Sequence, residues 1–140
     1  MNVLLIGTGR AAYHLGYALR SAGHALVGVA GRDPGRTHAL ADELGTAALA
    51  ISDARTQADM RVLAVSDDAI ETVASLLPRT DAPTIHLSGS RGDERIGMHG
   101  HRGVLWPIQS FSPGPPMDFR TIPLVIDAED EATRALLRTL

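Results

Sequence analysis

Three small residues near the start of the chain have the types and the spacing of a phosphate-binding turn. Gly7, Gly9 and Ala12 form a Gly-x-Gly-x-x-Ala pattern that follows the aliphatic run at residues 3–6. Gly7 permits a tight turn out of a strand, Gly9 lets a pyrophosphate approach the backbone, and Ala12 lets the next helix pack closely on the sheet. We predict that this turn binds a dinucleotide, and a glycine turn without a ligand is the alternative. The predicted cofactor contacts of the turn are Gly7, Thr8, Gly9, Arg10, Ala11 and Ala12.

The end of the second predicted strand, residues 25–30, indicates which dinucleotide is bound. NAD-binding proteins usually place Asp or Glu there, but this chain has Gly31 followed by Arg32. A guanidinium group binds a 2′-phosphate through paired N–H donors, and Arg36 is a candidate second contact. We therefore predict NADP (NADPH) as the cofactor. Asp33 leaves two alternatives open, because it could be the acid of an NAD site or the cap of the next helix.

The fourth predicted strand, residues 61–65, ends in polar residues at the same edge of the sheet. Val65, Ser66 and Asp67 should lie near the nicotinamide half of the cofactor, because the carboxyl ends of parallel strands share one edge. For Asp67, capping of the following helix is the alternative.

The fifth predicted strand, residues 84–87, carries the candidate catalytic residues. His86 could transfer a proton, and Ser88 could bind a substrate carbonyl. A structural role is the alternative for both. Three histidines at 86, 99 and 101 lie close in sequence and raise the possibility of zinc. His99 and His101, however, lie in a glycine-rich loop that offers them no obvious third ligand and no cysteine, so we predict no metal.

The apolar runs around these residues alternate between strand-like and helix-like patterns. This alternation predicts an α/β fold, with a Rossmann-type doubly wound and mainly parallel sheet of about six strands and helices on both faces. Residues 104–111 contain Pro107 and are predicted to be irregular or an edge strand, because proline cannot donate to a ladder. We place the NADP-binding domain at residues 1–126 and the start of a following helix at 127–140.

Composition limits the class of protein. The chain has 140 residues, of which 44% are hydrophobic, a formal net charge of −3 and no cysteine. This length fits one domain, and the absence of cysteine excludes disulfides and thiolate chemistry. The 13 Lys and Arg residues do not cluster, so we predict no nucleic-acid partner. Because no apolar run approaches the roughly 20 residues of a membrane helix, we predict a cytoplasmic protein without a membrane partner.

Several stretches together resemble one family. They are Val-Leu-Leu-Ile-Gly-Thr-Gly at 3–9, Gly-Arg at 31–32, Leu-Ala-Val-Ser-Asp-Asp-Ala-Ile at 63–70, His-Leu-Ser-Gly at 86–89 and, most specifically, Trp-Pro-Ile-Gln-Ser-Phe at 106–111. The chain resembles, over essentially all its length, bacterial Rossmann-like NADP oxidoreductases with a helical C-terminal domain of unknown function. These are relatives of pyrroline-5-carboxylate reductase, 6-phosphogluconate dehydrogenase and deazaflavin-dependent NADP oxidoreductases.

The resemblance implies hydride transfer between nicotinamide C4 and a small carbonyl or imine substrate. It also implies that this chain is truncated, because family members continue into a helical domain that supplies the dimer interface and much of the substrate pocket. We expect a homodimer that forms through an exposed leucine face of the last helix, at Leu136, Leu137 and Leu140. A non-catalytic nucleotide-binding or interaction module with the same fold is the alternative.

Overall fold

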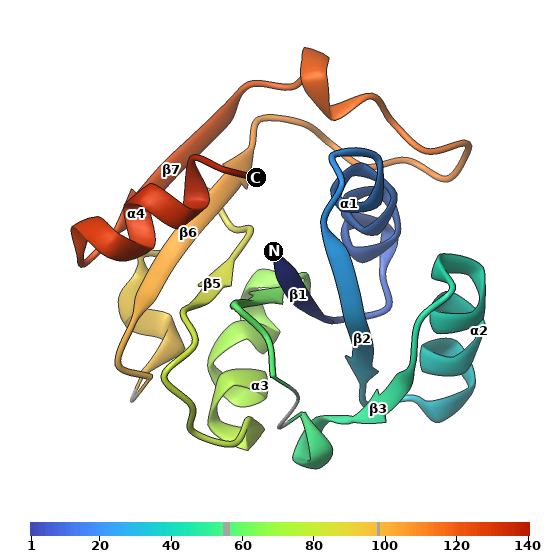
Figure 1. Ribbon diagram of the computed structural model, residues 1–140, viewed down its shortest axis with the longest axis horizontal. Helices are drawn as coiled ribbons and strands as arrows, with labels where there is room; N and C mark the ends of the chain where they lie inside the picture. The colour runs from blue at the N-terminus through green and yellow to red at the C-terminus, as the bar shows by residue number, and fades with distance from the viewer. Residues whose placement is uncertain (55–56, 98) are drawn as a thin grey trace.

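The computed structural model describes residues 1–54, 57–97 and 99–140, and its described strands form one seven-stranded sheet (Figure 1). The strand order is β3-β2-β1-β4-β5-β6-β7, in which β7 alone pairs antiparallel. The strands are β1 (Asn2–Ile6), β2 (Ala25–Gly31), β3 (Ala48–Ala50), β4 (Met60–Leu63), β5 (Thr84–His86), β6 (Arg102–Pro107) and β7 (Leu124–Ala128). The predicted Rossmann-type sheet is confirmed, with seven strands rather than about six.

Helices cover both faces of this sheet, as predicted for a doubly wound fold. The α-helices are α1 (Arg10–Ser21), α2 (Pro34–Leu44), α3 (Ile70–Leu76) and α4 (Glu131–Leu137). Buried residues of α1, α2 and α4 belong to one apolar cluster, and those of α3 belong to a second cluster on the opposite face (Figure 1). None of the helices in the described part of the chain is long and apolar enough to cross a membrane.

The segment predicted to be irregular or an edge strand is instead a regular inner strand, β6. Its residue Gly103 pairs with Ile85 of β5 on one side and with Ala128 of β7 on the other. The prediction was wrong because Pro107 is the last residue of β6, so its missing amide does not interrupt the ladder.

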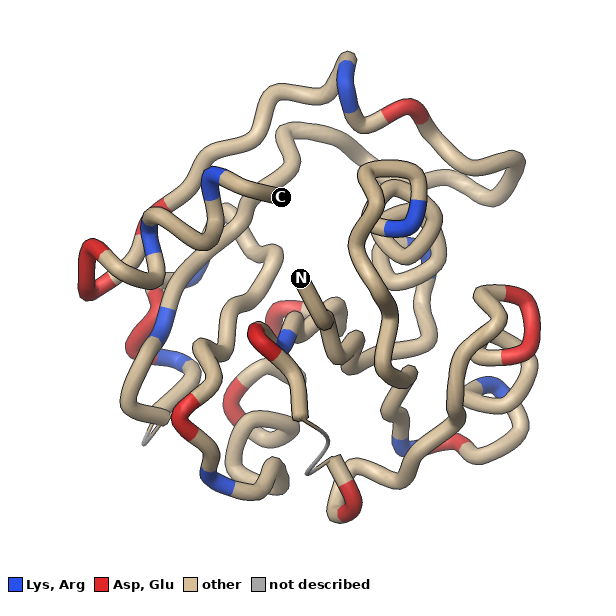
Figure 2. The backbone as a smooth tube through the Cα atoms, in the orientation of Figure 1, with Lys and Arg blue, Asp and Glu red and all other residues tan. Residues whose placement is uncertain are grey.

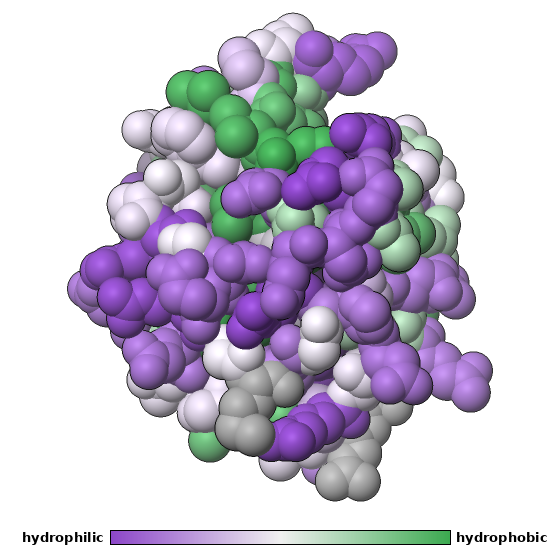
Figure 3. Space-filling view, turned by 90° about the vertical axis from the view of Figure 1, so that its left-hand side faces the viewer, coloured by the Kyte–Doolittle hydropathy of each residue, from purple (hydrophilic) through white to green (hydrophobic). Residues whose placement is uncertain are grey.

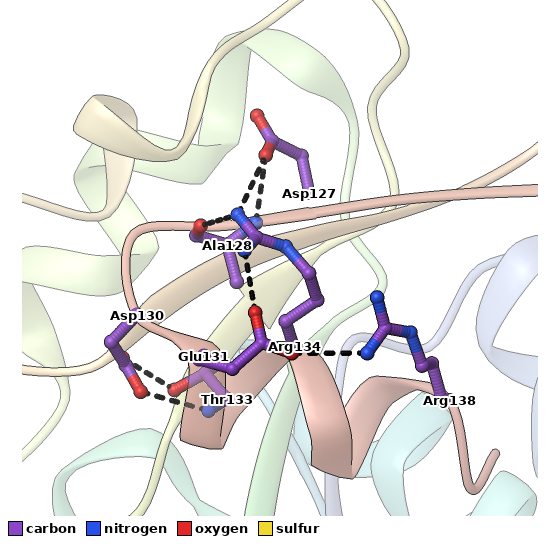
Figure 4. Close-up of polar contacts among 7 residues, drawn as sticks. All are labelled: Asp127, Ala128, Asp130, Glu131, Thr133, Arg134 and Arg138. Carbon is purple, nitrogen blue, oxygen red and sulfur yellow. Dashed lines mark hydrogen bonds and ion pairs between the residues drawn. The ribbon is translucent and has the colours of Figure 1, made fainter.

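Helix α4 begins with a capped and charge-complemented first turn (Figure 4). The carboxylate of Asp130 accepts hydrogen bonds from the amide and the hydroxyl of Thr133 at 2.8 and 2.7 Å. Arg134 donates to the carbonyl of Ala128 at 2.6 Å and pairs with Glu131 at 2.9 Å, which ties the helix to the end of β7. Figure 2 shows basic residues after acidic ones along this helix, the order that complements a helix dipole.

The leucine face of the last helix is covered by the chain's own sheet. Leu137 is only 2% exposed, and Leu136 and Leu140 are partly buried against the same apolar cluster. The expected exposure of this face was therefore wrong, because the chain turns back after β7 and lays α4 on the sheet. The homodimer, and the division of the chain at residue 126, stay predictions.

Most of the large apolar side chains that remain exposed in the described part of the chain lie on β6 and β7 or directly after β6. Figure 3 shows hydrophobic atoms in the upper part of the face that carries β7 and α4. Leu124 and Val125 of β7 are exposed, and Trp106 of β6 pairs with Val125. The indole of Trp106 lies directly against Gly89, where a Cβ would overlap the ring, so β6 also supports the loop after β5.

Candidate functional site

A cavity of about 330 Å³ lies at the carboxyl ends of β1, β2 and β4. It joins three segments that the sequence predicted separately: the glycine turn, the end of β2 with the start of α2, and the loop after β4. The predicted residues that line it are Gly7, Thr8, Gly9, Gly31, Arg32, Asp33, Arg36, Val65 and Ser66. The apolar part of its wall comes from Ile6, Ile51, Ala64, Ala69 and Val73.

The glycine turn has the backbone geometry that its pattern predicted. Gly7 has a φ of +127°, and a Cβ at this position would overlap the carbonyl oxygen of Ala64. Gly9 differs, because a Cβ there would meet no described atom within 4 Å. Ala12 is fully buried in the apolar cluster under α1, as close helix packing requires. The space in front of Gly9 is therefore open to a ligand group.

The start of α1 supplies the donors for such a group. Gly9 is the N-cap residue, and the described structure has neither a side-chain cap there nor an acidic residue in the first turn. The first intrahelical bond shown runs from the amide of Tyr13 to the carbonyl of Gly9, at 3.0 Å. The first amides of an α-helix have no intrahelical acceptor and lie at the positive end of the helix dipole. The amides of residues 10–12 are thus suited to an anion at the open face of Gly9.

The end of β2 packs closely on its neighbours, which requires that residue 31 has no side chain. A Cβ on Gly31 would overlap the hydroxyl of Thr37 and crowd the methyl group of Thr8. Arg32 follows it, is exposed and lines the cavity. A guanidinium therefore stands at the position where NAD-binding proteins usually have a carboxylate.

Asp33 and Arg36 connect α2 to the glycine turn. A carboxylate oxygen of Asp33 accepts a hydrogen bond from the amide of Arg36 at 3.1 Å, so Asp33 is the N-cap of α2. The guanidinium of Arg36 donates to the carbonyl of Thr8 at 3.3 Å. The capping alternative for Asp33 is confirmed, and Arg36 places a second cation beside the cavity.

In the loop after β4, some residues line the cavity and one forms a hydrogen bond to the loop after β5. Val65 and Ser66 line the cavity, whereas Asp67 begins the 3₁₀ turn η2 (Asp67–Ala69) and is not part of the lining. The carboxylate of Asp67 accepts a hydrogen bond of 2.7 Å from the hydroxyl of Ser90, and this bond lowers the pKa of Asp67.

His86 and Ser88 hold the loop after β5 instead of lining the cavity. His86 is fully buried, and its Nδ1 accepts a hydrogen bond from the amide of Ser88 at 3.1 Å. Its Nε2 therefore carries the proton and donates to the carbonyl of Gly92 at 2.9 Å. The hydroxyl of Ser88 accepts from the amide of Ser90 at 3.2 Å. Both side chains have structural roles here, and their catalytic role stays a prediction.

The three histidines considered as metal ligands have separate partners. His86 bonds to its own loop, His99 accepts a hydrogen bond from buried Arg61 at 2.9 Å, and His101 lies 3.1 Å from Asp130. Burial lowers the pKa of His99. The described residues contain no group of three or more side chains that could hold a metal ion.

The sequence interpretation missed a buried histidine in α1. His14 is 1% exposed, its Nε2 lies 2.9 Å from the carbonyl of Ser112, and its Nδ1 accepts from the amide of Met117 at 3.3 Å. The ring also stacks on Phe111. Residues 112–114 thereby form one wall of a second cavity of about 410 Å³, whose other wall contains residues 8–10. The helical spacing of His14 from Ala11 and Ala18 was the signal for its burial.

Comparison with known proteins agrees with this geometry. The profile of the family described as "NADP oxidoreductase coenzyme F420-dependent" matches residues 2–90. No curated protein matches the chain. A candidate NADP oxidoreductase from Bacteroides fragilis is similar in structure, with 26% identity, a TM-score of 0.82, and coverage of 97% of this chain and 54% of that one.

Two further solved structures share the fold at lower identity. Protein TM1727 from Thermotoga maritima is 20% identical, with a TM-score of 0.72 and coverage of 99% of this chain and 55% of that one. A pyrroline-5-carboxylate reductase from Streptococcus pyogenes is 19% identical, with a TM-score of 0.77 and coverage of 99% and 53%. The chain thus spans about half the length of each of these proteins. It belongs to the family of coenzyme F420-dependent NADP oxidoreductases and forms an NAD(P)-dependent Rossmann domain of this family.

Proposed function

We propose that the cavity of about 330 Å³ binds NADP(H) and that the protein is an oxidoreductase acting on a small carbonyl or imine substrate. The observation that carries the proposal is the meeting of an open glycine turn, a helix N-terminus and two arginines in one cavity. When bound, nicotinamide supplies or accepts the hydride, while the chain binds and orients the cofactor. The substrate class comes from the family resemblance.

The diphosphate fits the turn between β1 and α1. The open face of Gly9 leaves room for a phosphate, and the amides at the start of α1 can donate to its oxygens. Gly7 packs against the carbonyl group of Ala64, and this close contact is possible because Gly7 has no side chain. Thr8 and Arg10 complete this part of the predicted contact set.

The 2′-phosphate fits the arginines at the end of β2. Arg32 lines the cavity directly after Gly31, and Arg36 reaches the glycine turn from α2. The carboxylate of Asp33 is engaged as the cap of α2, which favours a phosphate-bearing ribose over a free 2′-hydroxyl at this point. We therefore assign NADP(H) as the preferred cofactor.

The rings fit against the apolar wall of the cavity. Ile51, Ala69 and Val73 offer side chains for packing on the side of the turn that is opposite α1. Val65 and Ser66 follow β4 and are the candidate neighbours of the nicotinamide ribose. Excluding water at these positions would strengthen the polar contacts that hold the cofactor.

Calorimetric titration of the chain with NADPH and with NADH tests this proposal. We expect saturable binding of one NADPH per chain and binding of NADH that is weaker by about tenfold or more, as expected for loss of a charge-assisted contact. Equal affinities would contradict the NADP assignment, and absence of binding to both would contradict the dinucleotide site.

Catalytic turnover of NADPH needs a test of its own, because binding of the cofactor does not establish catalysis. A panel of small carbonyl and imine compounds, with coenzyme F420 included because the family description names it, would be followed through the absorbance of NADPH. We expect NADPH consumption with at least one class. Saturable NADPH binding without turnover on any class would favour the non-catalytic module.

A further inference from the structure

We propose that Asp67, positioned by Ser90, makes the site prefer the oxidised form of the cofactor over the reduced form. This inference rests on the proposed function, because it concerns the nicotinamide end of the bound cofactor, beside the cavity lining at Val65 and Ser66. Asp67 is then a specificity-determining residue, and Ser90 is a positioning residue that acts through it.

The position of Asp67 follows from the order of the strands. β4 and β5 are neighbours in the sheet, and Asp67 bridges the loops at their carboxyl ends through its 2.7 Å bond to Ser90. Val65 and Ser66, which precede it directly, line the cavity. The adenosine half of a dinucleotide lies towards β2, so the nicotinamide half lies towards this bridge.

The loop that carries Ser90 is held from several sides. The hydroxyl of Ser88 accepts a hydrogen bond from the amide of Ser90, and the indole of Trp106 packs directly on Gly89. His86 donates to the carbonyl of Gly92 in the same loop. The hydroxyl of Ser90 therefore has a defined place from which to orient the carboxylate of Asp67.

Two contacts parallel to the Asp67–Ser90 bond strengthen the same pair of loops. Asp68 forms an ion pair with Arg91 at 3.4 Å, and Glu71 of α3 forms one with Arg95 at 3.2 Å. These pairs keep the loop after β5 close to the start of α3. They also occupy the arginines of this region, so each guanidinium already has a carboxylate partner.

The charge on Asp67 is available to a ligand. Its 2.7 Å hydrogen bond comes from the neutral hydroxyl of Ser90, and within the described residues its carboxylate forms no ion pair of its own. The guanidinium of Arg91, which pairs with Asp68, contributes to the lowered pKa of Asp67 only after the hydroxyls of Ser90 and Ser88. The bond from Ser90 lowers the pKa of Asp67, so the group is ionised at neutral pH. Oxidised nicotinamide carries a positive charge and reduced nicotinamide does not, so a nearby carboxylate stabilises the oxidised form selectively.

The variant Asp67→Asn tests this inference with a matched control. Affinities would be measured by calorimetry for NADP⁺, for NADPH and for 2′-phospho-ADP-ribose, which lacks the nicotinamide ring. We expect Asp67→Asn to weaken NADP⁺ binding by about three- to tenfold relative to NADPH, as for one partly screened charge. Binding of 2′-phospho-ADP-ribose should not change. Asp118→Asn removes the same charge at a position that pairs with Arg120 away from the cavity, and it should leave the ratio of the two affinities unchanged.

The dependence of the ratio of NADP⁺ to NADPH affinity on ionic strength is a second test, because a purely structural role of Asp67 would not change this dependence. The preference of the unmodified protein for NADP⁺ should decrease from low to high salt, and the ratio for Asp67→Asn should stay constant. An equal loss for all three ligands in Asp67→Asn, or an unchanged ratio of NADP⁺ to NADPH affinity, would overturn the inference. Failure of the unmodified chain to bind any of them would instead overturn the proposed function.

Discussion

The α-carbon of Gly7 lies against the carbonyl oxygen of Ala64, so closely that a Cβ on residue 7 would overlap that oxygen. This contact joins the turn after β1 to the end of β4, the two strands that flank the cavity. The first glycine of the motif is thus a packing requirement of the sheet edge, whereas the second glycine is open to a ligand.

Alanine substitutions at the two glycines should therefore separate stability from binding. Gly7→Ala should lower the free energy of unfolding by at least about 2 kcal/mol, because it combines a positive φ with steric overlap. Gly9→Ala should change stability by less than about 1 kcal/mol but weaken NADPH binding about tenfold or more, because its Cβ would occupy the phosphate space. Urea denaturation and calorimetry measure the two effects. Equal destabilisation by both variants would contradict this distinction.

Arg32→Ala should remove most of the discrimination between NADPH and NADH. The loss of a charge-assisted contact to the 2′-phosphate costs about 1.5–3 kcal/mol, or roughly 10- to 150-fold in the dissociation constant of NADPH. NADH affinity should change little, because this ligand has no 2′-phosphate. Arg120→Ala is a matched control, since Arg120 is exposed and pairs with Asp118 away from the cavity. Retention of the preference in Arg32→Ala would refute the cofactor assignment.

His14→Ala should destabilise the protein through the loop at residues 112–117. The substitution leaves the carbonyl of Ser112 and the amide of Met117 without their side-chain partner and removes the ring from Phe111, at a cost of about 2 kcal/mol. The midpoint of urea denaturation measures this loss. His38→Ala, at an exposed position of α2, should stay within about 0.5 kcal/mol of the parent. A similar midpoint for both variants would show that the tie from α1 to this loop is not stabilising.

Asp130 should make a pH-dependent contribution to stability. Hydrogen bonds from the amide and hydroxyl of Thr133, with a smaller contribution from His101, lower the pKa of Asp130 from 3.8 to about 2. Because the pKa is lower in the folded state, the stabilisation is fully present above about pH 4 and is lost as the pH falls towards 2. Asp130→Ala should cost about 1 kcal/mol at neutral pH, as for loss of an N-cap. Denaturation curves at several pH values should show this difference shrinking in acid, and a constant difference would contradict the assignment.

Local sequence patterns determined much of the fold and the location of the cavity. Capping of α2 by Asp33 was one of the two alternatives that the sequence offered, because this side chain acts within one turn of its own helix. The glycine pattern at 7–12 and the arginine after Gly31 marked two walls of the cavity, because each belongs to a single strand–turn–helix unit. In such units the interacting groups are close in sequence, so residue type and spacing are sufficient.

Only the tertiary structure decided which distant groups meet. β6 became an inner strand because β7 returned beside it, and the leucines of α4 were buried because that helix folded back on the sheet. The ring of His86 forms a hydrogen bond to the carbonyl of Gly92 in the loop that follows it. The ring of His14 forms hydrogen bonds to the backbone of Ser112 and Met117, which are 98 and 103 residues further along the chain. These outcomes depend on which surfaces remain unpaired once the sheet has formed. Periodicity and spacing describe one segment at a time, so they do not contain that information.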